Sequence, residues 1–165
     1  MKKVLTTISL SLMLLLLVAS VSVAAEQSVT VNPFGLLVGT LNGTYEKSLN
    51  NHNSFLIGGT FYSWTLSGDN VTALGASAGY RKYMGDEDFS GFFGQGAAGI
   101  SFASAPEVST TVFNVTGLVG YKWLFDQGFT VEAGIGGNYI IGELEGYASF
   151  GGFIPSILLS LGYSW

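Results

Sequence analysis

The chain has 165 residues, a formal net charge of −5, a mean hydropathy of +0.44 and no cysteine. The acidic balance excludes nucleic acid as a partner, because phosphate backbones are bound by basic surfaces. Disulfides are excluded, and with only 10% charged residues the chain is too apolar for an ordinary soluble domain.

The N-terminus is organised like a secretory signal peptide. Lysines at 2–3 give a positive start, 10–18 form a short apolar core, and Val-Ala-Ala at 23–25 offers a small-residue cleavage site. The apolar core is shorter than the ~20 residues that a membrane-spanning helix needs. We therefore predict that residues 1–25 are a signal peptide, which is removed, and that 26–165 form a single domain.

The remainder of the chain alternates between apolar residues and polar or small ones with a period of two. This alternation predicts β-strands with one oily face, separated by turns rich in Asn, Asp, Gly and Ser. The 24 glycines argue against helices. Seven strand segments are clear: 37–45, 54–66, 72–83, 91–103, 109–125, 128–140 and 156–165.

A chain that is apolar on average but never continuously apolar is typical of strands in lipid. Each unpaired backbone group in hydrocarbon costs several kcal/mol, so such strands must close on themselves. We predict an all-β fold, a closed antiparallel transmembrane β-barrel. Bacterial single-chain barrels have even strand numbers, so we expect eight strands. The eighth is either 28–35 or part of 140–150, and we prefer the second.

The barrel also restricts where prolines and aromatic residues can lie. None of the three prolines, Pro33, Pro106 and Pro155, is expected mid-strand, because proline cannot donate to the ladder. Aromatic residues near strand ends are expected to form interfacial girdles: Tyr45, Trp64, Tyr83, Phe92, Tyr121, Trp123, Tyr139, Tyr163 and Trp165.

Four charged residues fall on the polar faces of the predicted strands. A cation at the lipid midplane costs roughly 2–4 kcal/mol, so these side chains must point into the lumen. They are Glu46, Arg81, Lys122 and Glu132, two anions and two cations. We interpret them as a salt-bridged plug that fills a narrow barrel, with a proton, ion or ligand relay as the functional alternative.

The last strand carries an aromatic terminal residue. Its apolar positions are Ile157, Leu159, Leu161, Tyr163 and Trp165, separated mainly by serine and glycine. This pattern resembles the signal that closes bacterial outer-membrane barrels and is read by their insertion machinery. Most such signals end in Phe, so a terminal Trp is a less common variant.

Motifs along the chain extend the resemblance. They are Asn-Pro-Phe-Gly-Leu-Leu at 32–37, Gly-Gly-Thr-Phe-Tyr-Ser-Trp at 58–64, Gly-Tyr-Arg-Lys-Tyr at 79–83, Gly-Tyr-Lys-Trp at 120–123 and Gly-Ile-Gly-Gly-Asn-Tyr at 134–139. These resemble a family of small bacterial outer-membrane barrels of unknown function, over most of 28–165. A looser similarity is to small barrels that pass hydrophobic compounds sideways into the membrane. Neither resemblance assigns a catalytic residue.

Enzymes also exist on small barrels, so two chemical motifs need weighing. His52-Asn53-Ser54 has the His-x-Ser spacing of lipid A deacylases, with Glu46 near in sequence, but it lies early in the chain in an Asn-rich turn. We interpret it as a solvated turn. The Gly-x-Gly-x-x-Gly match at 94–99 continues a strand pattern and lacks the helix that a dinucleotide site requires.

We therefore expect a non-enzymatic monomer in the outer membrane, with both termini in the periplasm. Its expected role is structural or at the cell surface, or the narrow passage of small molecules, hydrophobic ones included. The alternatives are a lipid-modifying enzyme of the deacylase type and a soluble periplasmic lipocalin-like carrier. We expect no cofactor and no metal, since the chain has one histidine. The expected partners are outer-membrane lipid and the insertion machinery.

Overall fold

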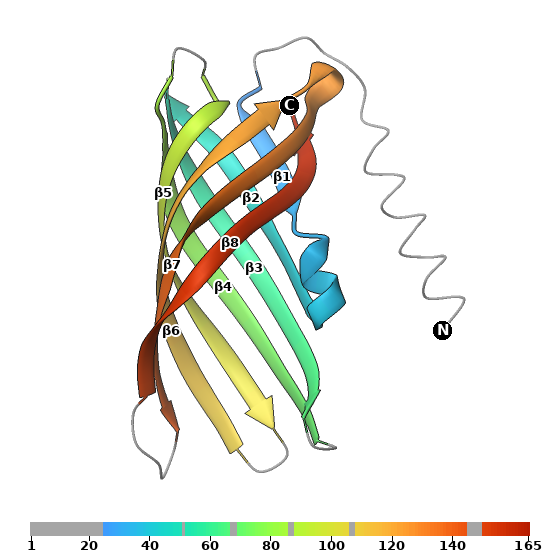
Figure 1. Ribbon diagram of the computed structural model, residues 1–165, viewed down its shortest axis with the longest axis vertical. Coiled ribbons are helices and arrows are strands. Elements are labelled where there is room, and N and C mark those ends of the chain that lie inside the picture. The colour runs from blue at the N-terminus through green and yellow to red at the C-terminus, as the bar shows by residue number, and fades with distance from the viewer. Residues whose placement is uncertain (1–24, 51, 67–68, 86–87, 106–107, 145–149) are drawn as a thin grey trace, which may run out of the picture.

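The computed structural model describes residues 25–165 except 51, 67–68, 86–87, 106–107 and 145–149. The predicted signal peptide therefore lies almost entirely outside the described residues. Eight antiparallel strands follow one another around a closed barrel (Figure 1). This confirms the all-β, eight-stranded antiparallel barrel. None of the helices in the described part of the chain is long and apolar enough to cross a membrane.

Each strand is paired with its neighbours in sequence, as hairpin connections dictate. Two short 3-10 turns, η1 (Phe34–Val38) and η2 (Asp126–Gly128), interrupt the series. The strands are β1 (Gln27–Val31), β2 (Thr40–Asn50), β3 (Asn53–Leu66), β4 (Asp69–Tyr83), β5 (Gly91–Ala105), β6 (Val108–Leu124), β7 (Phe129–Leu144) and β8 (Phe150–Ser164).

The extra strand is the N-terminal one. β1 pairs with both β2 and β8, whereas residues 140–144 simply extend β7. Our preference for an eighth strand within 140–150 was therefore wrong. Residues 140–144 continue the strand pattern of 128–140, Phe150 already belongs to β8, and 145–149 lie outside the described residues. The alternative at 28–35 is correct in place, although its strand is only five residues long.

β1 is short for a local reason. The side chain of Asn32 accepts hydrogen bonds from the backbone N–H groups of Phe34 and Gly35, at 3.0 and 3.1 Å. This Asx-type turn, together with Pro33, which has no N–H to give to a ladder, bends the chain into η1. Gly39 returns it to β2 in the left-handed conformation, with φ of 74°.

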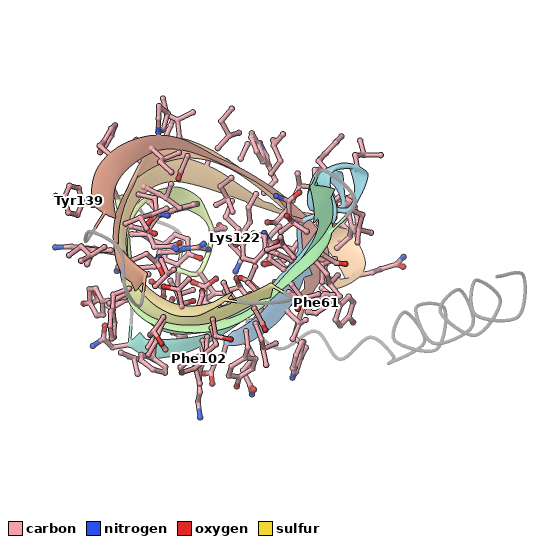
Figure 2. The ribbon with its side chains drawn as sticks, turned by 90° about the horizontal axis from the view of Figure 1, so that it is seen from below. Phe61, Phe102, Lys122 and Tyr139 are labelled. Atoms are coloured by element: carbon pink, nitrogen blue, oxygen red, sulfur yellow. The ribbon has the colours of Figure 1, made fainter. Side chains whose placement is uncertain are left out.

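The side chains alternate between the lumen and the outside. Figure 2 looks along the barrel and shows Lys122 inside the ring of strands, with Phe61, Phe102 and Tyr139 outside. In 54–66, whose faces the sequence left open, Phe55 and Phe61 lie outside and Leu56 is buried inside.

The outward faces of β5 to β8 share one apolar band. It runs from Phe92 to Phe102, Phe113 to Trp123, Val131 to Ile141 and Phe153 to Tyr163, with no charged residue among the outward positions. Each stretch is about eleven residues long, and a tilted strand needs ~9–11 to cross the hydrocarbon of a bilayer.

The wall is not equally complete on all sides. β7 and β8 are paired from Phe129–Tyr163 to Gly142–Phe150, but β1 and β8 only from Ser28–Ser164 to Val31–Leu161. Below β1 in Figure 1, β8 and η1 diverge. Pro155 lies inside β8, opposite Gly137, so the expectation that no proline falls mid-strand was wrong.

Candidate functional site

The four lumenal charges meet at the end of the barrel where β1 begins and β8 ends. Lys122 and Glu132 face each other in the β6–β7 register, while Glu46 and Arg81 come from β2 and β4. Strand parity points all four inward. Their fractional exposures are Glu46 1%, Arg81 1%, Lys122 0% and Glu132 2%.

The four groups alternate in sign along a chain of contacts. Nη1 of Arg81 lies 2.6 Å from Oε1 of Glu132 and 2.9 Å from Oε2 of Glu46. Nζ of Lys122 lies 2.9 Å from the same Oε2 of Glu46. Two cations and two anions therefore balance each other within one buried cluster, as burial of charge requires.

Neutral groups satisfy much of the remaining hydrogen-bonding capacity. Tyr83 donates its hydroxyl to Oε1 of Glu46 at 2.7 Å. Nε and Nη2 of Arg81 both donate to Oε1 of Gln95, at 3.0 and 2.7 Å. Lys122 donates to Ser28 at 3.1 Å. A buried ionic network needs such partners, because each missing one leaves a desolvated group unpaired.

Aromatic rings complete this plug. The guanidinium carbon of Arg81 lies 3.9 Å from the ring centroid of Phe93, and Nζ of Lys122 lies 3.6 Å from that of Phe89. Phe89 belongs to the β4–β5 turn, has a positive φ of 65° and is 2% exposed. Phe89, Phe93 and Tyr83 form a buried cluster against which Leu158 packs. We call these residues, with the four charges, the lumen plug.

The contacts of the lumen plug support a structural role, not a catalytic one. Both cations are shared with carboxylates, and neither carboxylate is left beside an empty space that a substrate could reach. Among the described residues, no group of three His, Asp or Glu side chains is placed to hold a metal ion. The arrangement ties β2, β4, β6 and β7 together across the lumen.

The sequence missed several members of the plug. Tyr83, expected in a girdle, is 1% exposed and lies inside the barrel, so that assignment was wrong. It is two residues from Arg81 on the same strand, so parity could have placed it inward. Phe89 carried no such signal, because it lies in a turn. The side chain of Trp64 lies outside what the structure describes.

The C-terminal strand presents the predicted oily face. Ile157, Leu159, Leu161 and Trp165 are exposed on the outside of β8, and the rings of Tyr163 and Trp165 stack with centroids 6.2 Å apart. Trp165 also exchanges both backbone hydrogen bonds with Gln27, at 2.9 and 3.0 Å. This residue pair holds the barrel closed at the chain ends.

The His-x-Ser motif is not assembled into a relay. His52 lies in the β2–β3 turn with φ of 75°, and its Nδ1 is 3.4 Å from Oδ1 of Asp88. Glu46 is engaged by Arg81 and Lys122 instead. Across the described ranges, no hydrogen bond joins His52 to Ser54 or to Glu46.

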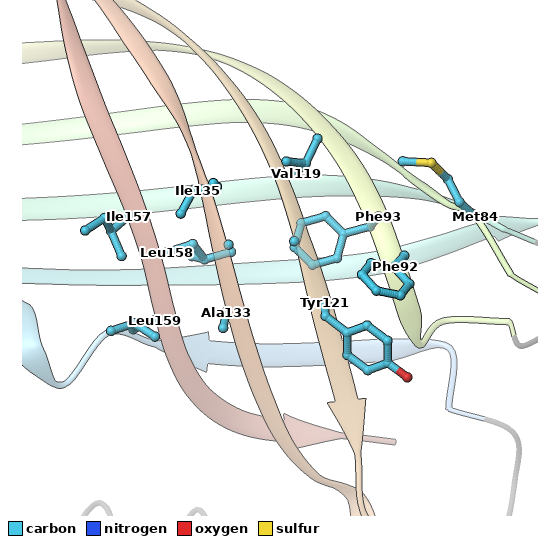
Figure 3. A pocket seen from close by; sticks show the side chains of 12 residues that line it. Met84, Phe92, Phe93, Val119, Tyr121, Ala133, Ile135, Ile157, Leu158 and Leu159 are labelled. Carbon is cyan, nitrogen blue, oxygen red and sulfur yellow. The ribbon is translucent and has the colours of Figure 1, made fainter.

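A shallow apolar groove of about 680 Å³ lies across β5 to β8 (Figure 3). Its lining is mostly outward-facing and includes the small residues Ala133 and Gly134. The larger lining residues include Phe92, Val119, Tyr121, Ile135, Ile157 and Leu159. The groove belongs to the outer apolar band.

Comparison with protein families identifies the chain's family. The model of a family described as protein of unknown function (DUF3575) matches residues 10–153. The chain belongs to this family. The match covers β1 to β7 and the first residues of β8, so it includes all four charges of the lumen plug. None of the curated proteins compared with the chain matches it.

Proposed function

We propose that this DUF3575 protein is a non-enzymatic outer-membrane β-barrel whose lumen is sealed at the periplasmic end. Its role is structural or at the cell surface, without axial flow of solutes. The observation that carries this proposal is the lumen plug, in which four charges at 2% exposure or less are joined across the barrel.

The apolar band supports the location in a membrane. Phe113, Val115, Val119 and Trp123, all outward on β6, are 54%, 59%, 57% and 41% exposed. A water-soluble barrel would leave this continuous oily belt in contact with solvent, whereas a bilayer covers it. The aromatic C-terminal strand and the N-terminal signal sequence favour export and insertion into the outer membrane.

The neutral balance of the plug supports a seal over a relay. A proton relay needs a group that can take up and release a proton. Here each carboxylate contacts at least one cation, which favours its charged form. An eight-stranded barrel is also only just wide enough for its own side chains. The expected partners are outer-membrane lipid and, during biogenesis, the insertion machinery. We expect the protein to be a monomer.

The test combines location and conductance on one preparation. The purified outer-membrane fraction should contain a band that runs faster in SDS before boiling than after it, because closed barrels in lipid resist SDS. Reconstituted in a planar bilayer, the same material should give no steady conductance. A protein found in the soluble periplasm without a mobility shift would favour the lipocalin-like carrier, and a steady pore would contradict the seal.

A further inference from the structure

The outer face of the barrel carries lysines on one side of the ring. Lys47 follows Glu46 on β2, and Lys82 follows Arg81 on β4. Successive side chains of a strand point to opposite faces. Because Glu46 and Arg81 are buried in the lumen, both lysines point outward, and both are exposed. Each lysine therefore lies on the outside of the wall, directly beside a charge of the lumen plug.

The plug also fixes the depth of the two lysines. Its charged groups contact one another at 2.6–2.9 Å, so the four side chains reach one level of the lumen. On the far side of the ring, the outward neighbours of Lys122 are Tyr121 and Trp123, whose ring centroids lie 4.7 Å apart. Aromatic belts of this kind lie at the headgroup level of a bilayer. Lys47 and Lys82 therefore lie at headgroup level in a barrel that spans the membrane.

The two lysines are close enough to share one ligand. Lys47 lies opposite Phe55 on β3. Lys82 lies opposite Asn53, two residues away on the same strand. With strands ~4.8 Å apart and a rise of ~3.4 Å per residue, the two lysine Cα atoms are about 12 Å apart, a span that two lysine side chains can close around one anion. Tyr80 lies opposite Phe55, and the two rings, 49% and 39% exposed, line the surface between the lysines.

Both ammonium groups are available to a ligand from outside the chain. Among the described residues, every ion pair joins plug charges to one another or His52 to Asp88, and neither outward lysine takes part in one. After residue 25 the chain has only two other lysines or arginines, Arg81 and Lys122, and both are buried in the plug. An anionic headgroup therefore meets an outward lysine or arginine only on β2 and β4.

The chemistry of this surface fits a phospholipid. Two ammonium groups attract a phosphate, which lysine binds as a point charge, and lysines near a membrane surface attract anionic lipids. Apolar side chains continue along β3 toward the bilayer centre: Phe55, Ile57 and Phe61 are outward and 39%, 51% and 44% exposed. An inorganic anion would use the lysines alone, whereas a lipid would also cover this apolar strip.

We propose that Lys47 and Lys82 form a binding site for an anionic glycerophospholipid of the periplasmic leaflet. Its phosphate lies between the two ammonium groups, and its acyl chains lie along the outer face of β3. The site gives the β2–β4 side of the barrel a preferred lipid, whereas the β5–β8 side offers only the uncharged apolar band. This inference rests on the membrane location proposed above.

The absence of cysteine allows a test with one label at a time. A bimane fluorophore is attached to an Ile57→Cys variant, beside the site, and separately to a Val119→Cys variant, outward on β6. Each is reconstituted in phosphatidylcholine vesicles that contain increasing fractions of dibrominated phosphatidylglycerol or dibrominated phosphatidylcholine. Quenching at position 57 should show a preference for phosphatidylglycerol of about fivefold for each lysine. Position 119 should show no preference, and inorganic phosphate in the buffer should not reduce that at 57.

Matched variants separate the lysine pair from the overall charge. In the Ile57→Cys protein, Lys47→Gln and Lys82→Gln should each lower the preference about fivefold, and the double variant should abolish it. Lys82→Arg keeps the charge and should keep the preference. Asp126→Asn changes the net charge by one unit in the exposed β6–β7 turn and should leave the preference unchanged. The heat-dependent gel shift checks that every variant is folded.

The outcomes separate the two proposals. If dibrominated phosphatidylcholine quenches neither label, the membrane location fails and the lipid site fails with it. If it quenches both labels but phosphatidylglycerol is not preferred at position 57, or is preferred equally at 119, only the lipid site is overturned. A preference that survives in the double lysine variant also overturns it, and displacement by inorganic phosphate would assign the lysines to a free anion instead.

Discussion

The two halves of this barrel use inward-facing polar residues in opposite ways. At the end where β1 begins and β8 ends, Glu46, Arg81, Lys122 and Glu132 are charged, paired and buried. In the other half, Asn114, Thr116 and Asn138 are neutral and half-buried, and β8 has an unpaired edge. Charges can be buried only where their partners are complete, so the sealed half should tolerate mutation poorly and the open half well.

The largest effect is expected from Arg81→Met. This change leaves Glu132 without its ion-pair partner and Glu46 with only Lys122, inside a buried cluster. Breaking a buried pair by removing one partner costs about 3–5 kcal/mol. Urea unfolding in vesicles, followed by the loss of the fast-running gel band, measures it. Lys82→Met, at the exposed neighbouring position, is the matched control. An equal loss of unfolding free energy in both variants would contradict the view that the buried charges stabilise this half of the barrel.

Phe89→Ala should come next and should also open the seal. The ring is 2% exposed and lies 3.6 Å from Nζ of Lys122. Truncating a buried Phe costs about 3–5 kcal/mol, and a turn that can collapse should give the lower part of that range. Planar-bilayer recording should then show conductance that the unmodified protein lacks. Phe92→Ala, at an exposed ring on the outer face, should leave the bilayer silent; no conductance in either variant would show that Phe89 does not close the lumen.

Tyr83→Phe isolates one hydrogen bond of the plug. The hydroxyl donates to Glu46 at 2.7 Å, and a hydrogen bond to a charged group contributes about 1.5–3 kcal/mol. We expect a loss of that size in the free energy of unfolding without a change in conductance. Tyr121→Phe, which removes a hydroxyl from the outer apolar band, should change stability much less. A null result for Tyr83 would mean that water replaces its hydroxyl and that the plug is wet.

Asn138→Ala removes side-chain hydrogen bonds from the open half and is compared with Arg81→Met in the sealed half. Its amide oxygen accepts from Asn114 at 3.2 Å and from Thr116 at 3.0 Å. Because these groups are half-buried, water can replace the bonds, and the loss should be about 0.5–1 kcal/mol. The same urea titration measures it. A loss as large as that of Arg81→Met would remove the distinction between the halves.

The smallest effect is expected from His52→Ala. The His52–Asp88 pair lies 3.4 Å apart and is substantially exposed, so it should contribute less than ~0.5 kcal/mol. Mass spectrometry of lipid A from cells with and without this variant should show the same acylation. A change in lipid A that depends on His52 would favour the enzyme reading and overturn the non-enzymatic proposal.

Several features of this protein follow from the sequence alone. Period-two alternation fixes which side of each strand is oily, and it places Glu46, Arg81, Lys122 and Glu132 on the opposite, inner side. The eight-stranded antiparallel barrel also followed from these patterns. These features depend on residues that lie close together in the sequence, so they can be predicted without knowing which strands become neighbours.

Other features depend on which strands become neighbours. The sequence could not show that Glu46 lies between Arg81 and Lys122, residues 35 and 76 positions away, or that Phe89 folds back from a turn. Nor could it show that β1 stops at Val31 and leaves Pro155 on an unpaired edge. Alternation determines the face of each residue, but register and strand length around the ring determine contacts. Only the closed tertiary structure sets these, because closure brings the first strand against the last.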